Sequence, residues 1–343
     1  LMMIGDGNLL DGLNILTTEN PEKFKSMGGP TDPVPFYTIF TGMMLVQLFY
    51  WGTNQQIIQR ALGAKNLKEG QKGLVLASFI KILGPIIVVL PGIIAYHLFE
   101  GNLESADSAY PELVRKVLPG AWVGFFAAVL FGAILSSFNS VLNSSVTLFG
   151  IDVYKQHINK NADEKTVVKY GKAFGVVLAI ASMFIAPLIA NAGSLFAYLQ
   201  EINGIYSIPI LTIIVVGYLT KRVPAIAAKI GLVSGCLLYI LSQFFMQPYF
   251  IEKAVSIAKL NGITDTAELA LIKAQAYPHF LDVMAILFIL NIIIMLIIGK
   301  LKPRETDFIQ EYTQQVDIEP WKYVKQVGVA ICIVVIGVYI YFA

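Results

Sequence analysis

Long apolar runs alternate with short polar stretches along almost the whole chain. The apolar runs cover about residues 36–58, 73–98, 119–150, 170–191, 194–219, 224–247, 279–299 and 324–342. Each run is long enough to cross a hydrocarbon layer of ~30 Å as a helix, which takes about 20 residues. The pattern therefore predicts about eight spans, and an all-α membrane protein built as a multi-span helical bundle in a lipid bilayer.

Three stretches do not follow this simple pattern. Residues 1–35 are polar and rich in Pro and Gly, so we expect a loop region with one short helix at most. The run at 119–150 is longer than a bilayer requires, so its helix should continue past the membrane surface toward Tyr154. Residues 248–278 have mixed charge and an amphipathic pattern, and we expect a loop there.

Composition supports a membrane protein and excludes other classes. The chain is 56% hydrophobic and 14% charged, whereas an average soluble domain has about 25% charged residues. The net charge of +2 does not favour a nucleic-acid partner. No nucleotide-binding loop, metal-spaced His/Cys set or nucleophile motif occurs, so we expect neither an enzyme nor a catalytic residue nor a cofactor.

Basic residues gather in alternate loops, which predicts an orientation. They follow the first, third, fifth and seventh runs, within residues 59–72, 151–169, 220–223 and 300–323, whereas the loop 99–118 is acidic. The positive-inside rule makes the basic side cytoplasmic. We therefore expect a multi-pass protein of the cell membrane with both chain ends on the extracytoplasmic side.

Polar and aromatic side chains share one helix face in the first run. Gln47, Tyr50, Trp51 and Asn54 stand at i, i+3, i+4 and i+7, and Gly52-Thr53 weakens the helix nearby. This face indicates either a binding site at membrane depth or an interfacial aromatic belt.

Lys81 is the clearest ionisable residue inside a predicted span. It follows Lys72 by nine residues, or roughly 13 Å along a helix, which is too deep for full snorkelling to the surface. Its ammonium group must meet water, a hydroxylated ligand or a carboxylate, or serve as an ion-paired structural lysine.

The third run carries a stripe of small polar residues at Ser136, Ser140, Asn143 and Thr147. Such a stripe lines either a polar cavity or a tight helix contact. Hydroxyls beside a free carbonyl would also suit a hard cation such as sodium, which prefers oxygen ligands.

The fifth run combines a polar face with helix-weakening residues. Phe196, Gln200 and Asn203 lie on one face, while Gly204 and Pro209 follow. These two residues predict a kinked helix whose freed backbone groups need partners within the protein.

Several motifs in the first five runs resemble the sodium/solute symporter family, specifically its sodium/glucose branch. The likeness runs from about residue 37 to about 235. It is carried by Tyr50-Trp51-Gly52-Thr53-Asn54-Gln55 with Ile58-Gln59-Arg60-Ala61-Leu62-Gly63-Ala64-Lys65-Asn66, and by Leu90-Pro91-Gly92, Leu135-Ser136-Ser137, Leu142-Asn143-Ser144, Asp152-Val153-Tyr154-Lys155 and Tyr198-Leu199-Gln200.

The resemblance implies a core of ten helices in two inverted five-helix repeats around a midplane site. Residues 36–220 would form the second five-helix repeat, residues 1–35 an extracellular loop region, and residues 221–343 accessory transmembrane helices with their loops. The chain would then be a fragment, and the missing N-terminal half of the same protein would be its partner.

The resemblance also assigns site residues. Tyr50 matches an aromatic that stacks on the sugar and closes the inner gate, with Trp51 beside it. Gln47 stands where a bacterial galactose transporter of the family has asparagine. The matching sugar-binding lysine and glutamine are Lys81 and Gln200, and the matching sodium ligands are the Ala133 carbonyl, Ser136 and Ser137.

The resulting expectation is a secondary active transporter that carries a glucose- or galactose-like sugar together with sodium by alternating access. Its small-molecule partners would be that sugar and sodium as the coupling ion. Three alternatives within transport stay open: myo-inositol, a sugar acid or another small solute. A sensor or channel with the same fold is an alternative outside coupled transport.

Overall fold

The computed structural model describes residues 1–32, 34–103, 105–189, 195–309 and 317–343. Within these residues it contains helices and no β-strand, which confirms the all-α prediction. In this described part of the chain, seven helical stretches are long and apolar enough to cross a membrane: Leu67–Leu98, Gly120–Ile158, Glu164–Ile189, Tyr198–Leu219, Ala225–Leu260, Thr266–Leu301 and Val324–Tyr341. Each overlaps one predicted span, although the boundary that we placed at residues 190–194 lies outside the described residues.

The first predicted span, 36–58, is not one continuous helix, and this prediction was wrong. The 3-10 helix η2 (Phe36–Phe40) stops at Thr41, α2 (Gly42–Gly52) stops at Thr53, and α3 (Gln55–Leu62) follows. The second break falls at the Gly52-Thr53 pair, where the sequence indicates weakness. At the first break, Thr41 has φ −115° and ψ −110°, outside the helical region, so the helical hydrogen bonding is interrupted.

The chain divides into two compact units. Unit 1 comprises residues 1–24, 59–195 and 319–336, and unit 2 comprises residues 25–58, 196–318 and 337–343. The expected division into a loop region, a five-helix repeat and accessory helices follows a different criterion and stays a prediction.

Unit 1 is built around two long helices that pack through glycines. Its elements are α1 (Leu9–Glu19), η1 (Pro21–Phe24), α4 (Leu67–Ile82), η3 (Pro85–Val89), α5 (Leu90–Leu98), η4 (Ala106–Ser108), α6 (Ala109–Val117), α7 (Gly120–Leu148), η5 (Phe149–Ile158), α8 (Glu164–Ile189) and most of α14 (Val324–Tyr341). A Cβ atom on Gly175 of α8 would lie 2.7 Å from Val146 Cγ2 of α7, so the glycine permits close approach. Helix α7 continues into η5, and the buried Tyr154 stacks on Tyr170 at 4.4 Å, which confirms the expected extension.

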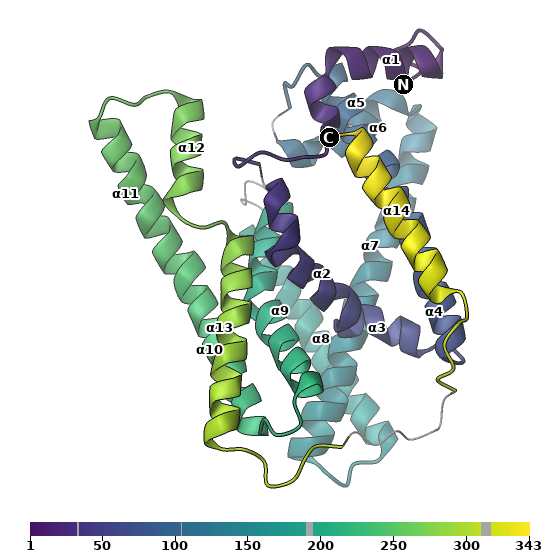
Figure 1. The fold of residues 1–343 in the computed structure, drawn as a ribbon. Helices are drawn as coiled ribbons and strands as arrows, with labels where there is room; N and C mark the ends of the chain where they lie inside the picture. Colours follow the sequence, from purple (N-terminus) through teal and green to yellow (C-terminus); the bar gives the residue numbers. More distant parts are fainter. Residues whose placement is uncertain (33, 104, 190–194, 310–316) are drawn as a thin grey trace. The chain divides into compact units, whose positions relative to one another are not determined.

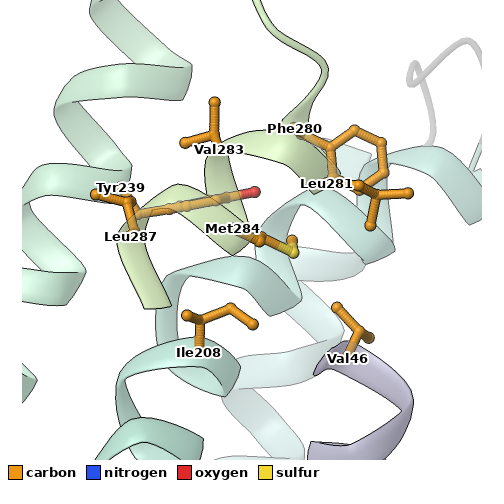
Figure 2. Packing of buried hydrophobic residues seen from close by; sticks show 8 residues of the cluster. All are labelled: Val46, Ile208, Tyr239, Phe280, Leu281, Val283, Met284 and Leu287. Carbon is orange, nitrogen blue, oxygen red and sulfur yellow. The ribbon is translucent and has the colours of Figure 1, made fainter. Parts of the chain in front are cut away.

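Unit 2 contains a core of buried apolar side chains. Its further elements are α9 (Leu195–Leu219), α10 (Ala225–Ile240), η6 (Leu241–Met246), α11 (Gln247–Leu260), α12 (Thr266–Ala276) and α13 (Phe280–Leu301) (Figure 1). Side chains from α2, α9, α10 and α13 form its main apolar cluster (Figure 2): Val46, Ile208, Tyr239, Phe280, Leu281, Val283, Met284 and Leu287. Helix α2 therefore packs within unit 2 on helices that come more than 150 residues later in the chain.

Helix α9 runs continuously from Leu195 to Leu219, with Pro209 inside it. A Cβ atom on Gly204 would lie 2.3 Å from Met284 Cε and 2.4 Å from Tyr239 Cζ. Pro209 in turn faces Gly235 of α10, where an added Cβ atom would lie 2.7 Å from the proline Cγ. Both residues that predicted a kink thus serve close packing of α9 against α10 and α13.

The predicted loop at 248–278 is helical instead. Helices α11 and α12 occupy most of it and lie side by side as a hairpin (Figure 1). The mixed charge that suggested a loop belongs to two helices. Asp265 begins the second by accepting a hydrogen bond from the Glu268 backbone N–H at 2.9 Å.

Candidate functional site

Helix α2 has one buried face and one exposed face, and the exposed face is polar and aromatic. Gly42, Val46 and Phe49 are buried, whereas Gln47, Tyr50 and Trp51 are exposed. Trp51 Nε1 donates to Gln47 Oε1 at 3.1 Å, and the Tyr50 ring meets the Trp51 ring edge-on at a centroid distance of 5.3 Å. The three predicted residues therefore form one cluster with an amide and two ring systems.

Asn54 does not belong to this cluster, and its predicted place on the same face was wrong. It lies in the break after α2, where its side-chain oxygen accepts the backbone N–H of Gln56 at 3.0 Å. A side-chain amide of this kind favours a helix start, so Asn54 caps α3 instead of extending α2.

Helix α9 carries the next predicted residue, Gln200, which is half-buried. Helix α2 touches α9 through Phe49 and Tyr206, whose rings meet at 5.9 Å, and the Tyr206 hydroxyl donates to the side-chain oxygen of Asn203. Asn203 stands three residues after Gln200 on the same helix face. Within unit 2, the Gln47 cluster and Gln200 thus sit on contacting helices.

Lys81 lies in the last turn of α4, in unit 1, and its side chain is exposed on that unit. Helix α4 ends one residue later, and Pro85 follows in the π-helical turn η3. Lys81 therefore stands where the regular helix of this span changes to π-helical geometry. Such changes often occur at functional sites.

The small polar residues of α7 line an open groove of about 760 Å³ in unit 1. Its lining residues are Gln59, Arg60, Gly132, Leu135, Ser136, Asn139, Ser140 and Asn143. Helix α8 packs instead on Leu142 and Val146 of α7. The contact with α8 therefore leaves the serine stripe open within unit 1.

Arg60 is a groove residue that the sequence reasoning missed, because it was counted only as a loop charge. Its Nη2 donates to the hydroxyl of Ser140, which donates to the Ser136 backbone carbonyl at 2.9 Å. The available signal was the amphipathic pattern of Gln55–Leu62, which places Arg60 on the polar face of a short helix.

The predicted sodium ligands have neutral oxygen donors. Ala133, Ser136 and Ser137 stand at i, i+3 and i+4 on α7 and so lie on one side of the helix, and of the three Ser136 lines the groove. Among the described residues, no group of three or more His, Cys, Asp or Glu could hold a metal ion. Hydroxyl and carbonyl oxygens fit a hard monovalent cation and not a transition metal.

The predicted site residues fall into two sets, one in each unit. Gln47, Tyr50, Trp51 and Gln200 belong to unit 2, while Lys81, Ala133, Ser136 and Ser137 belong to unit 1. In unit 2 the two helices that carry the set are in contact, and in unit 1 Ala133, Ser136 and Ser137 share helix α7 while Lys81 lies on α4.

Known proteins resemble this chain over most of its length. The model of the sodium:solute symporter family matches residues 12–235. An uncharacterized symporter of Escherichia coli, YidK, is 43% identical over 340 residues, which cover 99% of this chain and 54% of that protein. The sodium/glucose cotransporter of Vibrio parahaemolyticus is 37% identical over 64% of this chain and 42% of its own length, and human sodium/myo-inositol cotransporter 2 is 32% identical over 64% and 35%. The chain thus spans about half the length of the E. coli relative, and less of the others.

Proposed function

Because the chain belongs to the sodium:solute symporter family, we propose that it forms part of a secondary active transporter that couples sodium entry to the uptake of a sugar or related polyol. The family consists of symporters, which agrees with the prediction that the chain is not an enzyme. The seven apolar helices found among the described residues, together with the family, make it an integral membrane protein. The observation that carries the proposal is the exposed cluster of Gln47, Tyr50 and Trp51 on α2.

This cluster suits a hydroxylated ring. A pyranose has hydroxyls around its rim and apolar C–H groups on its faces, so it needs hydrogen-bonding groups beside an aromatic surface. Tyr50 would supply the surface, and Gln47 would hydrogen-bond to hydroxyls while held by the indole of Trp51 at 3.1 Å. Gln200 of the same unit would add a polar contact, and the resemblance to the family assigns a sugar-binding role to Lys81 as well.

Sodium would bind on α7. The Ala133 carbonyl and the hydroxyls of Ser136 and Ser137 supply three oxygens, and further ligands would come from outside this helix. By bridging two elements, sodium would stabilise the conformation that binds sugar from outside. A coupling free energy of roughly 1–3 kcal/mol is typical between two such sites.

The basic loops support an orientation for this transporter. We place residues 59–72, 151–169, 220–223 and 300–323 on the cytoplasmic side, because these loops carry most of the positive charge. Both ends of the chain would then lie on the extracytoplasmic side.

The substrate could be a sugar, myo-inositol or a sugar acid, and the relatives do not separate them. Their names include both a sodium/glucose and a sodium/myo-inositol cotransporter, at 37% and 32% identity. Both compounds are rings rich in hydroxyls, so the same cluster on α2 would serve either. We place a glucose- or galactose-like sugar first, because the identity to the sodium/glucose cotransporter is higher.

A competition experiment identifies the substrate class. The protein used is the completed transporter, defined as this chain joined to the part of the E. coli relative that the match leaves uncovered. Sodium-dependent binding of labelled glucose is competed with galactose, myo-inositol, glucuronate and proline. We expect the hydroxylated rings to compete and proline not to. Competition by proline alone would contradict the proposal.

A further inference from the structure

The start of α13 packs on the break that precedes α2. Asp282, in the first turn of α13, accepts a hydrogen bond from the Tyr37 hydroxyl at 2.9 Å through Oδ2, and one from Thr41 Oγ1 at 3.1 Å through Oδ1. Tyr37 belongs to η2, while Thr41 is the residue of the break itself. One carboxylate of α13 therefore holds both η2 and the break that precedes α2.

The backbones of α2 and α13 also touch directly. A Cβ atom on Gly42 would lie 1.8 Å from the Leu281 carbonyl oxygen, so no side chain fits at this position without moving one of the helices. One turn further on, the buried side chains of Val46 and Met284 pack within the cluster shown in Figure 2. The contact thus begins at the break and continues along α2.

These contacts determine the direction of α2. Because the helical hydrogen bonding stops at Thr41, η2 and α2 can change their relative angle there at little cost. The carboxylate of Asp282 holds η2 and the break, and the Gly42–Leu281 contact holds the first turn of α2. The exposed cluster of Gln47, Tyr50 and Trp51 lies on the helix that is fixed in this way.

We propose that Asp282 is a positioning residue that anchors α2 and so orients the cluster on its exposed face. The claim that this orientation serves a sugar site rests on the proposed function. Helix α13 lies beyond residues 12–235, so the anchor comes from a part of the chain that the family model does not describe. The alternative is that Asp282 only stabilises the start of α13, because a carboxylate interacts favourably with the positive end of the helix dipole.

Thiol labelling separates these two roles. In the completed transporter with Cys236 and Cys332 replaced by alanine, a cysteine at Gln47 reports on the cluster. A cysteine at Ile289 of α13, whose side chain is 59% exposed, is the matched control. Each loss of a hydrogen bond to a charged group shifts an equilibrium by about tenfold or more. We therefore expect Asp282→Ala to change the labelling rate at Gln47→Cys severalfold and leave Ile289→Cys unchanged.

Taken alone, Asp282→Asn, Tyr37→Phe and Thr41→Val test the anchor even if Asp282→Ala does not fold. Asp282→Asn keeps one acceptor oxygen and should change the rate less than alanine does. Tyr37→Phe and Thr41→Val each remove one donor, and each should lose its effect in the Asp282→Ala background, because the partner is already absent. Equal labelling rates at Gln47→Cys across folded variants, or equal changes at both reporter cysteines, would overturn the proposal.

Binding measurements on the same variants keep this inference distinct from the proposed function. If Asp282 anchors α2, sodium-dependent sugar binding, measured with Gln47 in place, should weaken from the wild type through Asp282→Asn to Asp282→Ala. If labelling behaves as expected but no sodium-dependent sugar binding exists, the proposed function fails and the anchor stands. If binding exists and labelling does not respond, the anchor fails and the function stands.

Discussion

Replacing Gly204 by alanine tests the packing of α9, the helix that carries Gln200. The new Cβ atom would lie 2.3 Å from Met284 Cε and 2.4 Å from Tyr239 Cζ. Neither neighbour has room to retreat, because Met284 is 0% and Tyr239 1% exposed. The Tyr239 hydroxyl is also held by the Glu201 carbonyl at 2.9 Å. Overpacking of this kind costs about 1–3 kcal/mol.

Gly217→Ala is the matched control, because Gly217 lies on the same helix and a Cβ atom added there would have nothing within 4 Å. Alanine is favoured over glycine within a helix by up to about 1 kcal/mol, and this gain applies to both variants. The difference between the two variants therefore isolates the packing cost. We expect Gly204→Ala to be less stable than Gly217→Ala by about 1–3 kcal/mol.

The assay is unfolding of both variants in lipid nanodiscs, followed by the fluorescence of the aromatic side chains. Sugar binding is measured in parallel, because α9 also carries Gln200, one turn before Gly204. If α9 is displaced, Gly204→Ala should weaken sugar binding while Gly217→Ala does not. Equal stability of the two variants would refute the packing of α9 against α10 and α13.

Three further predictions concern the proposed site and its orientation. In the completed transporter, Ser137→Ala should lower the apparent sodium affinity much more than the sugar affinity at saturating sodium; unchanged sodium activation would make this serine a packing residue. Lys81→Ala should weaken sugar binding about 10- to 150-fold, because a hydrogen bond from a charged donor contributes roughly 1.5–3 kcal/mol; a lower melting temperature with unchanged sugar binding would instead make Lys81 structural. A cysteine at Lys68 should react with membrane-impermeant reagents from the cytoplasmic side and one at Glu100 from the outside, and the reverse pattern would contradict the orientation.

The helices were predictable wherever a long apolar run occurs without interruption. Composition alone indicates such runs, because a bilayer demands about 20 apolar residues in a helix. The hairpin of α11 and α12 was missed because its charges are mixed, and charge says little about helix formation when each helix is short. The break at Thr41 was missed although Gly42 follows it, because a single glycine within an apolar run is often tolerated inside a helix.

The candidate site was predictable only where its residues share one helix. Helical spacing alone indicated that Gln47, Tyr50 and Trp51 form one face. Contacts between distant segments gave no comparable signal. Asp282 follows Tyr37 by 245 residues and Arg60 precedes Ser140 by 80, and a single sequence contains nothing that links either pair.

Sodium-driven accumulation is the measurement that tests the central claim most directly. The completed transporter is placed in liposomes with an inward sodium gradient, and the ratio of labelled sugar inside to outside is followed. We expect this ratio to exceed unity, and to return to unity when an ionophore dissipates the gradient or potassium replaces sodium. A ratio that never exceeds unity, or that is the same in potassium, would contradict sodium-coupled symport.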